Sequence, residues 1–321
     1  MTLPSTTGSS TPSEPPELSV VIAVIAGGYA TMATCLAALE AGVRSHRIEC
    51  LVPYDDRVDG VDTLRERFGW ARFIDARDRV NAARYGAHSR EHHDVLRAIG
   101  LGQARGAIVA LLEDHGTPSA GWCDAVLDAH RDTSAAIGGA VENGVDRLLN
   151  WAVYYCDFGR YQNPVPTGPA EFISDSNVAY KREALESVRA VWEDAYHETA
   201  VNWALRNRGE TLRLDPNMVV AQTRRLRFGS ALRERFVWGR SFAGTRVAEV
   251  GRPRRLILAT LSSVLPVVLT FRVLAGGLSR RRHSSRLLLA LPLIAALETI
   301  WSVGEFVGYV TGNPGYRVDT T

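Results

Sequence analysis

The chain is almost without lysine, and its few cysteines have none of the spacings that bind metal. Lys181 is the only lysine, so arginine supplies nearly all of the positive charge. The four cysteines are scattered, without a CxxC pair, which excludes a zinc ribbon and predicts small buried side chains in a reducing compartment. The formal net charge is only +2, so charge does not indicate a nucleic-acid-binding protein, and no nucleic-acid partner is expected.

The N-terminus lacks the basic and apolar regions of a signal peptide. Residues 1–17 are rich in Ser, Thr and Pro, which predicts a disordered tail and a catalytic part that stays in the cytoplasm. The phosphate turn G-x-G-x-x-G of dinucleotide-binding proteins is also missing, because residues 26–29 read Ala-Gly-Gly-Tyr. This disfavours a dehydrogenase. With 46% hydrophobic and 22% charged residues, the rest of the chain can bury a sizeable core.

Buried-strand patterns alternate with helical patterns in the first half of the chain. Apolar runs at residues 18–26, 48–52 and 107–112 predict strands, and helical patterns at 29–41 and 90–104 separate them. This alternation predicts an α/β fold, with a Rossmann-like, mainly parallel sheet and flanking helices. Ligands of such sheets bind beyond the carboxyl ends of the strands, and acidic residues follow two of these strands.

The character of the chain changes after a predicted catalytic domain at residues 18–225. Residues 226–255 predict an amphipathic basic linker helix, and residues 256–310 contain two apolar stretches, the first broken by Pro266. A membrane span needs about 20 apolar residues, and both stretches are marginal because they contain charges. Flanking arginines and terminal aromatics favour two membrane-associated or transmembrane helices over buried core helices. Hairpin and re-entrant insertion both stay open, and residues 311–321 predict a C-terminal tail.

Four stretches of residues 18–225 resemble the family 2 glycosyltransferases of GT-A fold, in the family's order. Residues 19–23 (SVVIA) resemble the opening strand. Residues 49–60 (ECLVPYDDRVDG) resemble the strand and acidic turn that follow, with Tyr54-Asp55 where the family has paired aspartates. The resemblance implies an inverting transfer of a sugar from a nucleotide-diphosphate sugar donor. It also implies that Asp55 hydrogen-bonds the base or ribose of that donor.

The second stretch is a helix with an arginine. Residues 96–100 (LRAIG) and 104–106 (ARG) resemble the family's helix, with Ala98 in place of an asparagine. By resemblance, Arg97 approaches the donor diphosphate. A bidentate guanidinium suits phosphate oxygens, although a surface helix arginine is the alternative.

The third stretch, residues 109–118 (VALLEDHGTP), resembles the context of the DxD motif, with Glu-Asp-His at its centre. The resemblance implies that Glu113 and Asp114 bind the donor. It also implies that Glu113 and His115 bind a divalent metal, Mn²⁺ or Mg²⁺, which neutralises charge on the leaving diphosphate. An apolar strand that ends in three polar residues favours this interpretation over a solvated turn.

The fourth stretch, residues 174–182 (SDSNVAYKR), resembles the family's acceptor-side wall. The resemblance places Asp175 and Asn177 on the acceptor side. A helix follows, and Glu198 at its start takes the position of the general base, with Asp194 as the runner-up. Ordinary capping of that helix is the alternative role for these acids.

Two further groups favour structural roles. The histidines His88, His92 and His93 predict a solvated loop rather than a metal cluster. An aromatic run at helical spacing predicts packing rather than a sugar-stacking platform; it comprises Trp151, Tyr154, Tyr155, Phe158 and Tyr161.

The patterns together predict a metal-assisted glycosyltransferase of polysaccharide or glycolipid biosynthesis. Its acceptor is expected to be lipid-linked, or otherwise to carry a hydroxyl or phosphate, and its site to be the cytoplasmic face of a bacterial inner (plasma) membrane. Four departures from the family keep a second hypothesis open: Tyr54, Ala98, the Glu-Asp-His triplet at residues 113–115, and His197 in place of the first of the two acids at the start of the helix that carries Glu198. In that hypothesis, the chain is a non-catalytic, degenerate transferase-like membrane protein that binds a nucleotide sugar or a partner subunit.

Overall fold

The computed structural model describes most of the 321-residue chain, in the ranges 14–25, 28–56, 58–80, 90–247, 250–313 and 315. The predicted tails at residues 1–17 and 311–321 lie largely outside the described residues, and so does His88.

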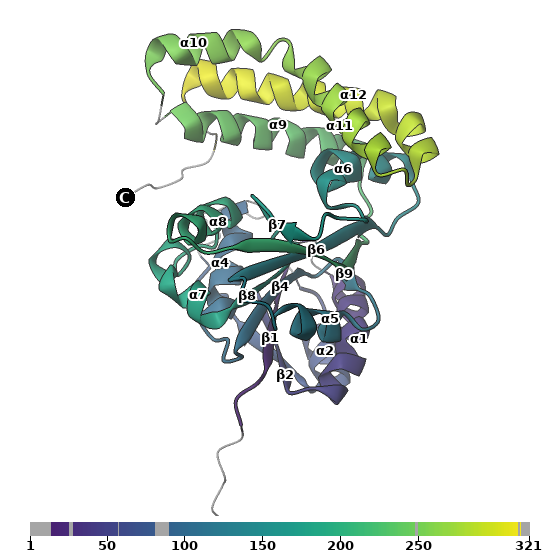
Figure 1. Cartoon of the computed structure of the whole chain (residues 1–321), viewed down its shortest axis with the longest axis vertical. Coiled ribbons are helices and arrows are strands. Elements are labelled where there is room, and N and C mark those ends of the chain that lie inside the picture. The colour runs from purple at the N-terminus through teal and green to yellow at the C-terminus, as the bar shows by residue number, and fades with distance from the viewer. Residues whose placement is uncertain are drawn as a thin grey trace, which may run out of the picture.

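One sheet forms the centre of the N-terminal part (Figure 1). Among the described residues its nine strands are β1 Leu18–Ala23, β2 Ile48–Tyr54, β3 Ala71–Asp75, β4 Ile108–Glu113, β5 Gly116–Pro118, β6 Ala136–Asn143, β7 Gly168–Pro169, β8 Asn177–Lys181 and β9 Leu212–Gln222. Their order is β3-β2-β1-β4-β8-β6-β9-β5, and β7 pairs with β9. Strands β1 to β4 pair in parallel, as do β6 and β9, whereas β8 lies antiparallel between β4 and β6. The predicted α/β fold class is confirmed.

Helices flank this sheet, and most of them turn an apolar side toward it, whereas α6 (Leu148–Asp157) packs its apolar side against α12 (Ser284–Thr311). They are α1 Tyr29–Ser45, α2 Val61–Arg67, α4 Arg90–Leu101, α5 Trp122–Ala129, α6 Leu148–Asp157, α7 Arg182–Ser187 and α8 Glu198–Asn207, with short 3-10 turns η1 Gly159–Tyr161 and η2 Arg189–Val191. In α4, for example, Leu96 and Ile99 belong to the main hydrophobic core together with Val20 and Ile22 of β1. Burying such side chains stabilises the fold by roughly 1.5–3 kcal/mol each.

The parallel strands place their carboxyl ends at one edge of the sheet. In the pairing of β1 with β4, Ala23 lies opposite Glu113, and β2 ends at Tyr54 directly before Asp55. The two acidic clusters that the sequence places at strand ends therefore share the edge at which ligands of α/β proteins bind.

Strand β9, eleven residues long, was not predicted. The sequence Asp215-Pro216-Asn217 lies in its middle and is typical of a turn, which hides the strand. The structure accommodates it by a shift of register between Gly139 and Ala140 of β6, so that pairing continues on both sides. Strand β8 begins at Asn177, within the stretch 174–182 that resembles the acceptor-side wall, so Asp175 lies in the loop before it. The end of β9 brings a further residue, Gln222, to the ligand edge.

The C-terminal helices form a separate layer beside α6 (Figure 1). They are α9 Phe228–Arg246, α10 Arg252–Leu261, α11 Leu265–Ser279 and α12 Ser284–Thr311. The first predicted apolar stretch is broken next to Pro266, and α10 and α11 meet at 64°. By length and composition, α12 is the one helix among the described residues that is long and apolar enough to cross a membrane; α10 and α11 qualify only as a bent pair.

The aromatic run joins this layer to the sheet domain. Trp151, Tyr154 and Tyr155 of α6 pack in one hydrophobic cluster with Leu287 and Ile294 of α12, which confirms the prediction of packing. Beside them, the buried guanidinium of Arg235 in α9 pairs with Asp157 of α6, with 2.6 Å between Nη2 and Oδ1. The contacts between α6, α9 and α12 therefore include both apolar burial and a buried ion pair.

Candidate functional site

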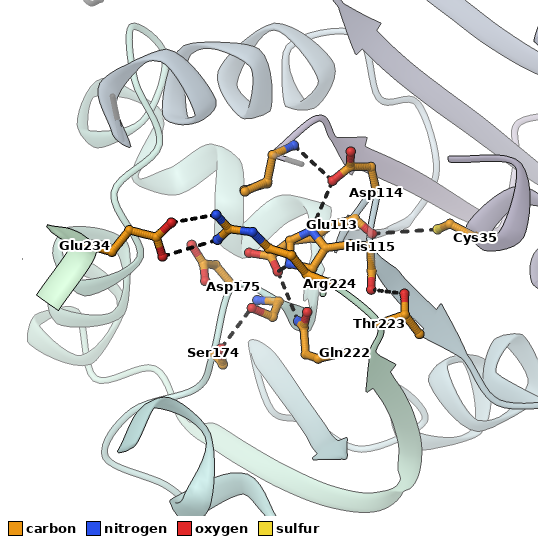
Figure 2. A network of polar contacts seen from close by, with 12 residues as sticks. Cys35, Glu113, Asp114, His115, Ser174, Asp175, Gln222, Thr223, Arg224 and Glu234 are labelled. Atoms are coloured by element: carbon orange, nitrogen blue, oxygen red, sulfur yellow. Dashed lines mark hydrogen bonds and ion pairs between the residues drawn. The ribbon is translucent and has the colours of Figure 1, made fainter. Parts of the chain in front are cut away.

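The end of β4 carries the centre of the candidate site. Glu113 is almost fully buried, and each of its carboxylate oxygens has a donor; Figure 2 shows Glu113 beside His115 and Gln222. Its Oε1 lies 3.2 Å from Nη2 of Arg97. Its Oε2 accepts a hydrogen bond from Nε2 of Gln222 at 3.0 Å and lies 3.3 Å from Nε2 of His115. The carboxylate is thus fixed from three directions.

The next two residues extend the same network. The backbone N–H of Ile25 donates to Oδ1 of the fully buried Asp114 at 3.0 Å, and this oxygen lies 3.1 Å from Nδ1 of His115. The imidazole of His115 therefore bridges Glu113 and Asp114. The backbone N–H and hydroxyl of Thr223 both donate to the carbonyl oxygen of His115, at 2.8 and 2.7 Å, so β9 holds the turn in place.

Arg97 of α4 is the hub of the cluster. Its Nη1 lies 2.9 Å from Oδ1 of Asp94, and its Nη2 lies 3.1 Å from Oδ2 of Asp175 in addition to the contact with Glu113. Burial by itself disfavours the charged guanidinium, but the carboxylates of Asp175, Asp94 and Glu113 outweigh it and raise the pKa of Arg97 above its ordinary value. Arg97 was predicted to approach a diphosphate. The structure instead turns its side chain to carboxylates from three separate elements.

The start of α8 is tied to the same cluster. Nδ1 of His197 lies 2.9 Å from Oδ2 of Asp94, and the backbone N–H of Tyr196 donates to the carbonyl oxygen of Asp94 at 3.0 Å. The neighbouring Glu198 is half-buried, and its Oε2 accepts the backbone N–H of Asp175 at 3.1 Å. The structure thus brings together Glu198, Asp175 and the Arg97 hub.

Asp194 is not brought to this cluster. It is exposed and lines a different hollow, next to Gly102 and Gln103 after the C-terminal end of α4. Since α4 runs antiparallel to β4, that end lies away from the carboxyl ends of the strands. As the candidate general base, Glu198 therefore fits the geometry better than Asp194.

Asp55 lies at the same edge, directly after β2, and pairs with Nε2 of His92 near the start of α4. Both side chains are buried. The prediction that His92 belongs to a solvated loop is wrong: His92 lies in the first turn of α4, and its imidazole pairs with the buried Asp55. His92 connects Asp55 to the helix that carries Asp94 and Arg97.

Asn177, predicted on the acceptor side, has structural partners. Its Nδ2 donates to the carbonyl oxygens of Ala140 and Met218 at 2.9 and 2.8 Å, and its Oδ1 accepts Nε1–H of Trp122 at 3.0 Å. The side chain is fully buried. It links β6, β9 and α5 inside the sheet, and the geometry does not support contact with an acceptor.

Replacing Asn177 by alanine is therefore expected to lower the free energy of unfolding by about 1–3 kcal/mol, because it leaves two carbonyls and an indole N–H buried without this partner. Urea unfolding of the full chain in detergent measures the change. A variant of parental stability that lost only transfer activity would contradict this structural role.

The cluster is rich in negative charge, yet its side chains do not fit a metal ion as they are arranged. Three carboxylates, those of Asp94, Glu113 and Asp175, contact the Arg97 guanidinium. Those of Asp55, Asp114 and Glu198 join the same network through His92, His115 and the backbone of Asp175. That balance attracts a cation. However, both oxygens of Glu113 are held by Arg97 and Gln222, and no three His, Cys, Asp or Glu side chains in the described part of the chain converge on a metal position.

A shallow hollow beside Thr223 supplies positive charge. It is lined by Gly144, Val145, Asp146, Arg147, Thr223 and Arg225. Thr223 also binds the carbonyl oxygen of His115, so the hollow borders the turn that carries the acidic cluster. Arg147 and Arg225 line this hollow, so an anionic ligand bound there can contact a guanidinium.

Several residues of the cluster were not predicted. Asp94 stands three residues before Arg97, so one face of a helix carries both, and this spacing is a signal that the sequence contains. Gln222 was not predicted because it ends β9, the strand that was not found from the sequence. Arg147 and Arg225 carry no motif in the resemblance and are recognised only when β6 and β9 are seen side by side.

No protein-family model matches the chain, and the search of curated proteins finds no match. Among solved structures, the chain is similar to a mannosyltransferase, PcManGT, of Pyrobaculum calidifontis in complex with GDP-Man and Mn²⁺, with 15% identity, a TM-score of 0.48 and coverage of 94% of this chain and 86% of the other. It is also similar to residues 1–349 of S. aureus TarS in complex with UDP-GlcNAc, with 12% identity, a TM-score of 0.46 and coverage of 92% of each chain. A mycobacterial protein matches with 14% identity, a TM-score of 0.39 and coverage of 66% of this chain and 68% of the other.

Proposed function

We propose that the chain is a glycosyltransferase that moves a sugar from a nucleotide-diphosphate donor to an acceptor with inversion. One observation carries the proposal. At the ligand edge of an α/β sheet, the Arg97 guanidinium holds Glu113 and Asp175, and the carboxylate of Glu198 lies against the backbone of Asp175. Carboxylates from β4, the loop before β8 and the start of α8 therefore lie around one point at which a base and a donor can meet.

The donor is assigned to the side of β2, β4 and β9. Asp55 suits the hydroxyl or N–H groups of a nucleoside, since it is a buried carboxylate at the end of a parallel strand. Glu113 and Asp114 border the sugar-diphosphate. Arg147 and Arg225 in the hollow beside Thr223 supply the positive charge that a diphosphate needs.

The chemical step is assigned to Glu198. The acceptor hydroxyl attacks the anomeric carbon from the face opposite the diphosphate, and its proton passes to the Glu198 carboxylate. The new bond forms between acceptor oxygen and anomeric carbon, and the bond to the diphosphate breaks with its electron pair remaining on the departing nucleoside diphosphate. Arg97 is a positioning residue, because it orients Glu113 and Asp175 through ion pairs. A divalent metal remains a prediction from the resemblance, and no step is assigned to it.

The second hypothesis, a non-catalytic domain that binds a nucleotide sugar or a partner subunit, is favoured by the pairing just described. The polar groups of Arg97 and Glu113 bind each other and neighbouring side chains of the protein. A site of this kind can hold a ligand without turning it over. Binding and turnover must therefore be measured separately.

A thermal-shift screen with UDP-, GDP- and dTDP-sugars, each with and without Mn²⁺, tests the donor assignment. A donor present at about 100 times its Kd is expected to add about 2.7 kcal/mol of stability and to raise Tm by several degrees. Asp55→Asn is expected to weaken the shift, whereas Asp56→Asn, at the exposed neighbouring carboxylate, is the matched control and is expected to keep it.

If none of these sugar nucleotides raises Tm, the donor assignment is wrong. A shift that is not followed by sugar transfer or donor hydrolysis in the same preparation favours the non-catalytic hypothesis.

A further inference from the structure

The outer helices of the C-terminal layer expose a continuous set of large apolar side chains. On α10 and the turn after it these are Leu256, Ile257, Leu261 and Val264, and on α11 they are Val267, Val268, Phe271 and Leu278. Val267 keeps 75% of its surface exposed and Phe271 keeps 69%. They recur at three- and four-residue spacing, so each helix presents one apolar side away from its neighbours. Exposure on this scale marks an interaction surface.

Helix α12 is long enough to cross a bilayer, but it packs against α9, which carries too many charges to do so. A Cβ on Gly304 would meet the backbone oxygen of Phe236 at 2.2 Å, and one on Gly308 would meet that of Arg240 at 2.5 Å. These contacts advance in the same direction along both helices, so α9 and α12 run parallel in close backbone contact. Within its 19 residues α9 carries four arginines and a glutamate. If α12 crossed a membrane, α9 would be carried into the hydrocarbon with it, which these charges oppose.

Both ends of α12 are also bound within the protein. At its start, Arg282 pairs with Glu142 at 2.7 Å and Arg286 pairs with Asp146 at 2.6 Å, both on the sheet domain. The hydroxyl of Tyr155 donates to the carbonyl oxygen of His283 at 3.1 Å. At its end, the guanidinium of Arg255 donates to the carbonyl oxygens of Tyr309 and Val310. These contacts tie the start of α12 to the sheet domain and α6, and its end to α10.

The charge of the outer helices has a single sign. Residues 250–297 contain eight arginines and not one aspartate or glutamate. Arg252 and Arg254 are exposed at the start of α10, and Arg281 is exposed after α11. An apolar side bordered by exposed arginines is complementary to a bilayer with anionic headgroups.

We propose that α10 and α11 are the membrane-binding surface of the protein and lie in the plane of an anionic lipid surface, and that α12 does not cross the bilayer. The occupant of the apolar surface is lipid. The sheet domain then lies on the side of the layer that α6 and α9 face (Figure 1). This inference does not depend on the proposed transferase activity, and its test measures binding and topology only.

Flotation of the full chain with vesicles tests the surface. We expect strong binding to vesicles of phosphatidylcholine with phosphatidylglycerol and weaker binding to phosphatidylcholine alone. Val267→Asp with Phe271→Asp is expected to reduce the bound fraction by at least about tenfold, since both side chains lose apolar burial and gain charge. Arg252→Gln with Arg254→Gln is expected to weaken binding to the anionic vesicles alone.

Trp203→Asp is the matched control, because Trp203 is 50% exposed but lies on α8 of the sheet domain. It is expected to bind vesicles like the parent chain. If the Val267→Asp, Phe271→Asp variant binds vesicles like the parent chain, the assignment of lipid to this surface is wrong. If the variant also dissociates a dimer that light scattering detects in the parent chain, the occupant is a second copy of the chain.

Labelling with a membrane-impermeant maleimide tests the course of α12. Ser285→Cys and Thr311→Cys place a thiol near each end of the helix at exposed positions, and the parent chain, whose cysteines are buried or half-buried, gives the background. In sealed inverted vesicles from expressing cells, both new thiols are expected to react. Reaction of only one of them before the vesicles are opened with detergent would show that α12 spans the membrane and overturn the proposal.

Discussion

Replacing Arg97 by leucine is expected to lower the free energy of unfolding by about 3–5 kcal/mol, because it leaves three buried carboxylates without their common partner. The side chain of Arg97 is only 3% exposed, and its ion pairs reach Asp94, Glu113 and Asp175. These carboxylates come from α4, β4 and the loop before β8, so the loss is felt in the core of the sheet and not at one helix alone. Urea unfolding followed by tryptophan fluorescence measures the change.

Two further variants make this result specific. Arg97→Lys keeps the charge but lacks the planar fork of five donors, so an intermediate loss is expected. Arg131→Leu removes an exposed arginine, whose partner Asp128 is also exposed, and is expected to cost less than about 1 kcal/mol. Equal stability of the Arg97→Leu and Arg131→Leu variants would show that the carboxylates do not depend on the guanidinium.

Replacing Glu198 by glutamine is expected to lower kcat for sugar transfer by about 10²- to 10⁴-fold, which is the usual contribution of a general base. The substitution is nearly isosteric, and the amide oxygen can still accept the backbone N–H of Asp175, so stability and donor binding are expected to change little. The measurement is the transfer of labelled sugar from the donor found by thermal shift to a hydroxyl-bearing lipid acceptor.

Asp194→Asn serves as the control for Glu198→Gln. Asp194 lies in a separate hollow near Gly102, so its variant is expected to retain the parental rate. A Glu198→Gln variant with the parental kcat would reject Glu198 as the base. Loss of both kcat and the donor-induced thermal shift would instead assign Glu198 to binding.

The position of the site was predictable because parallel strands share a direction. An apolar run followed by Asp55 and another followed by Glu113 are enough to place both acids at one edge, and the structure shows β2 and β4 on either side of β1. The fold class followed from the same alternation of strands and helices. Glu198 was found by resemblance, and the geometry brings it next to Asp175.

The side chains that bind the predicted site residues could not be identified from the sequence. Arg97 has three carboxylate partners that lie 3, 16 and 78 positions away along the chain, and only folding shows that it turns to them. Pro216 concealed β9 and with it Gln222, although a bulge in β9 between Asp215 and Val219 lets pairing with β6 continue on both sides. Asn177 has the residue type of a binding group, but its hydrogen bonds to Ala140, Met218 and Trp122 identify it as internal.

Strand β9 has a mechanical consequence. At its end, Gln222 grips Glu113, and two residues later Arg224 forms a two-pronged ion pair with Glu234 of α9 (Figure 2). Five residues, 223–227, therefore separate the strand that steadies the acidic cluster from the first helix of the C-terminal layer. Because this connection is short, the fold fixes the distance between the acidic cluster and the surface to which the C-terminal layer binds. Under the proposed function, an acceptor would then be selected by the distance of its reactive group from that surface, in addition to its contact with Glu198.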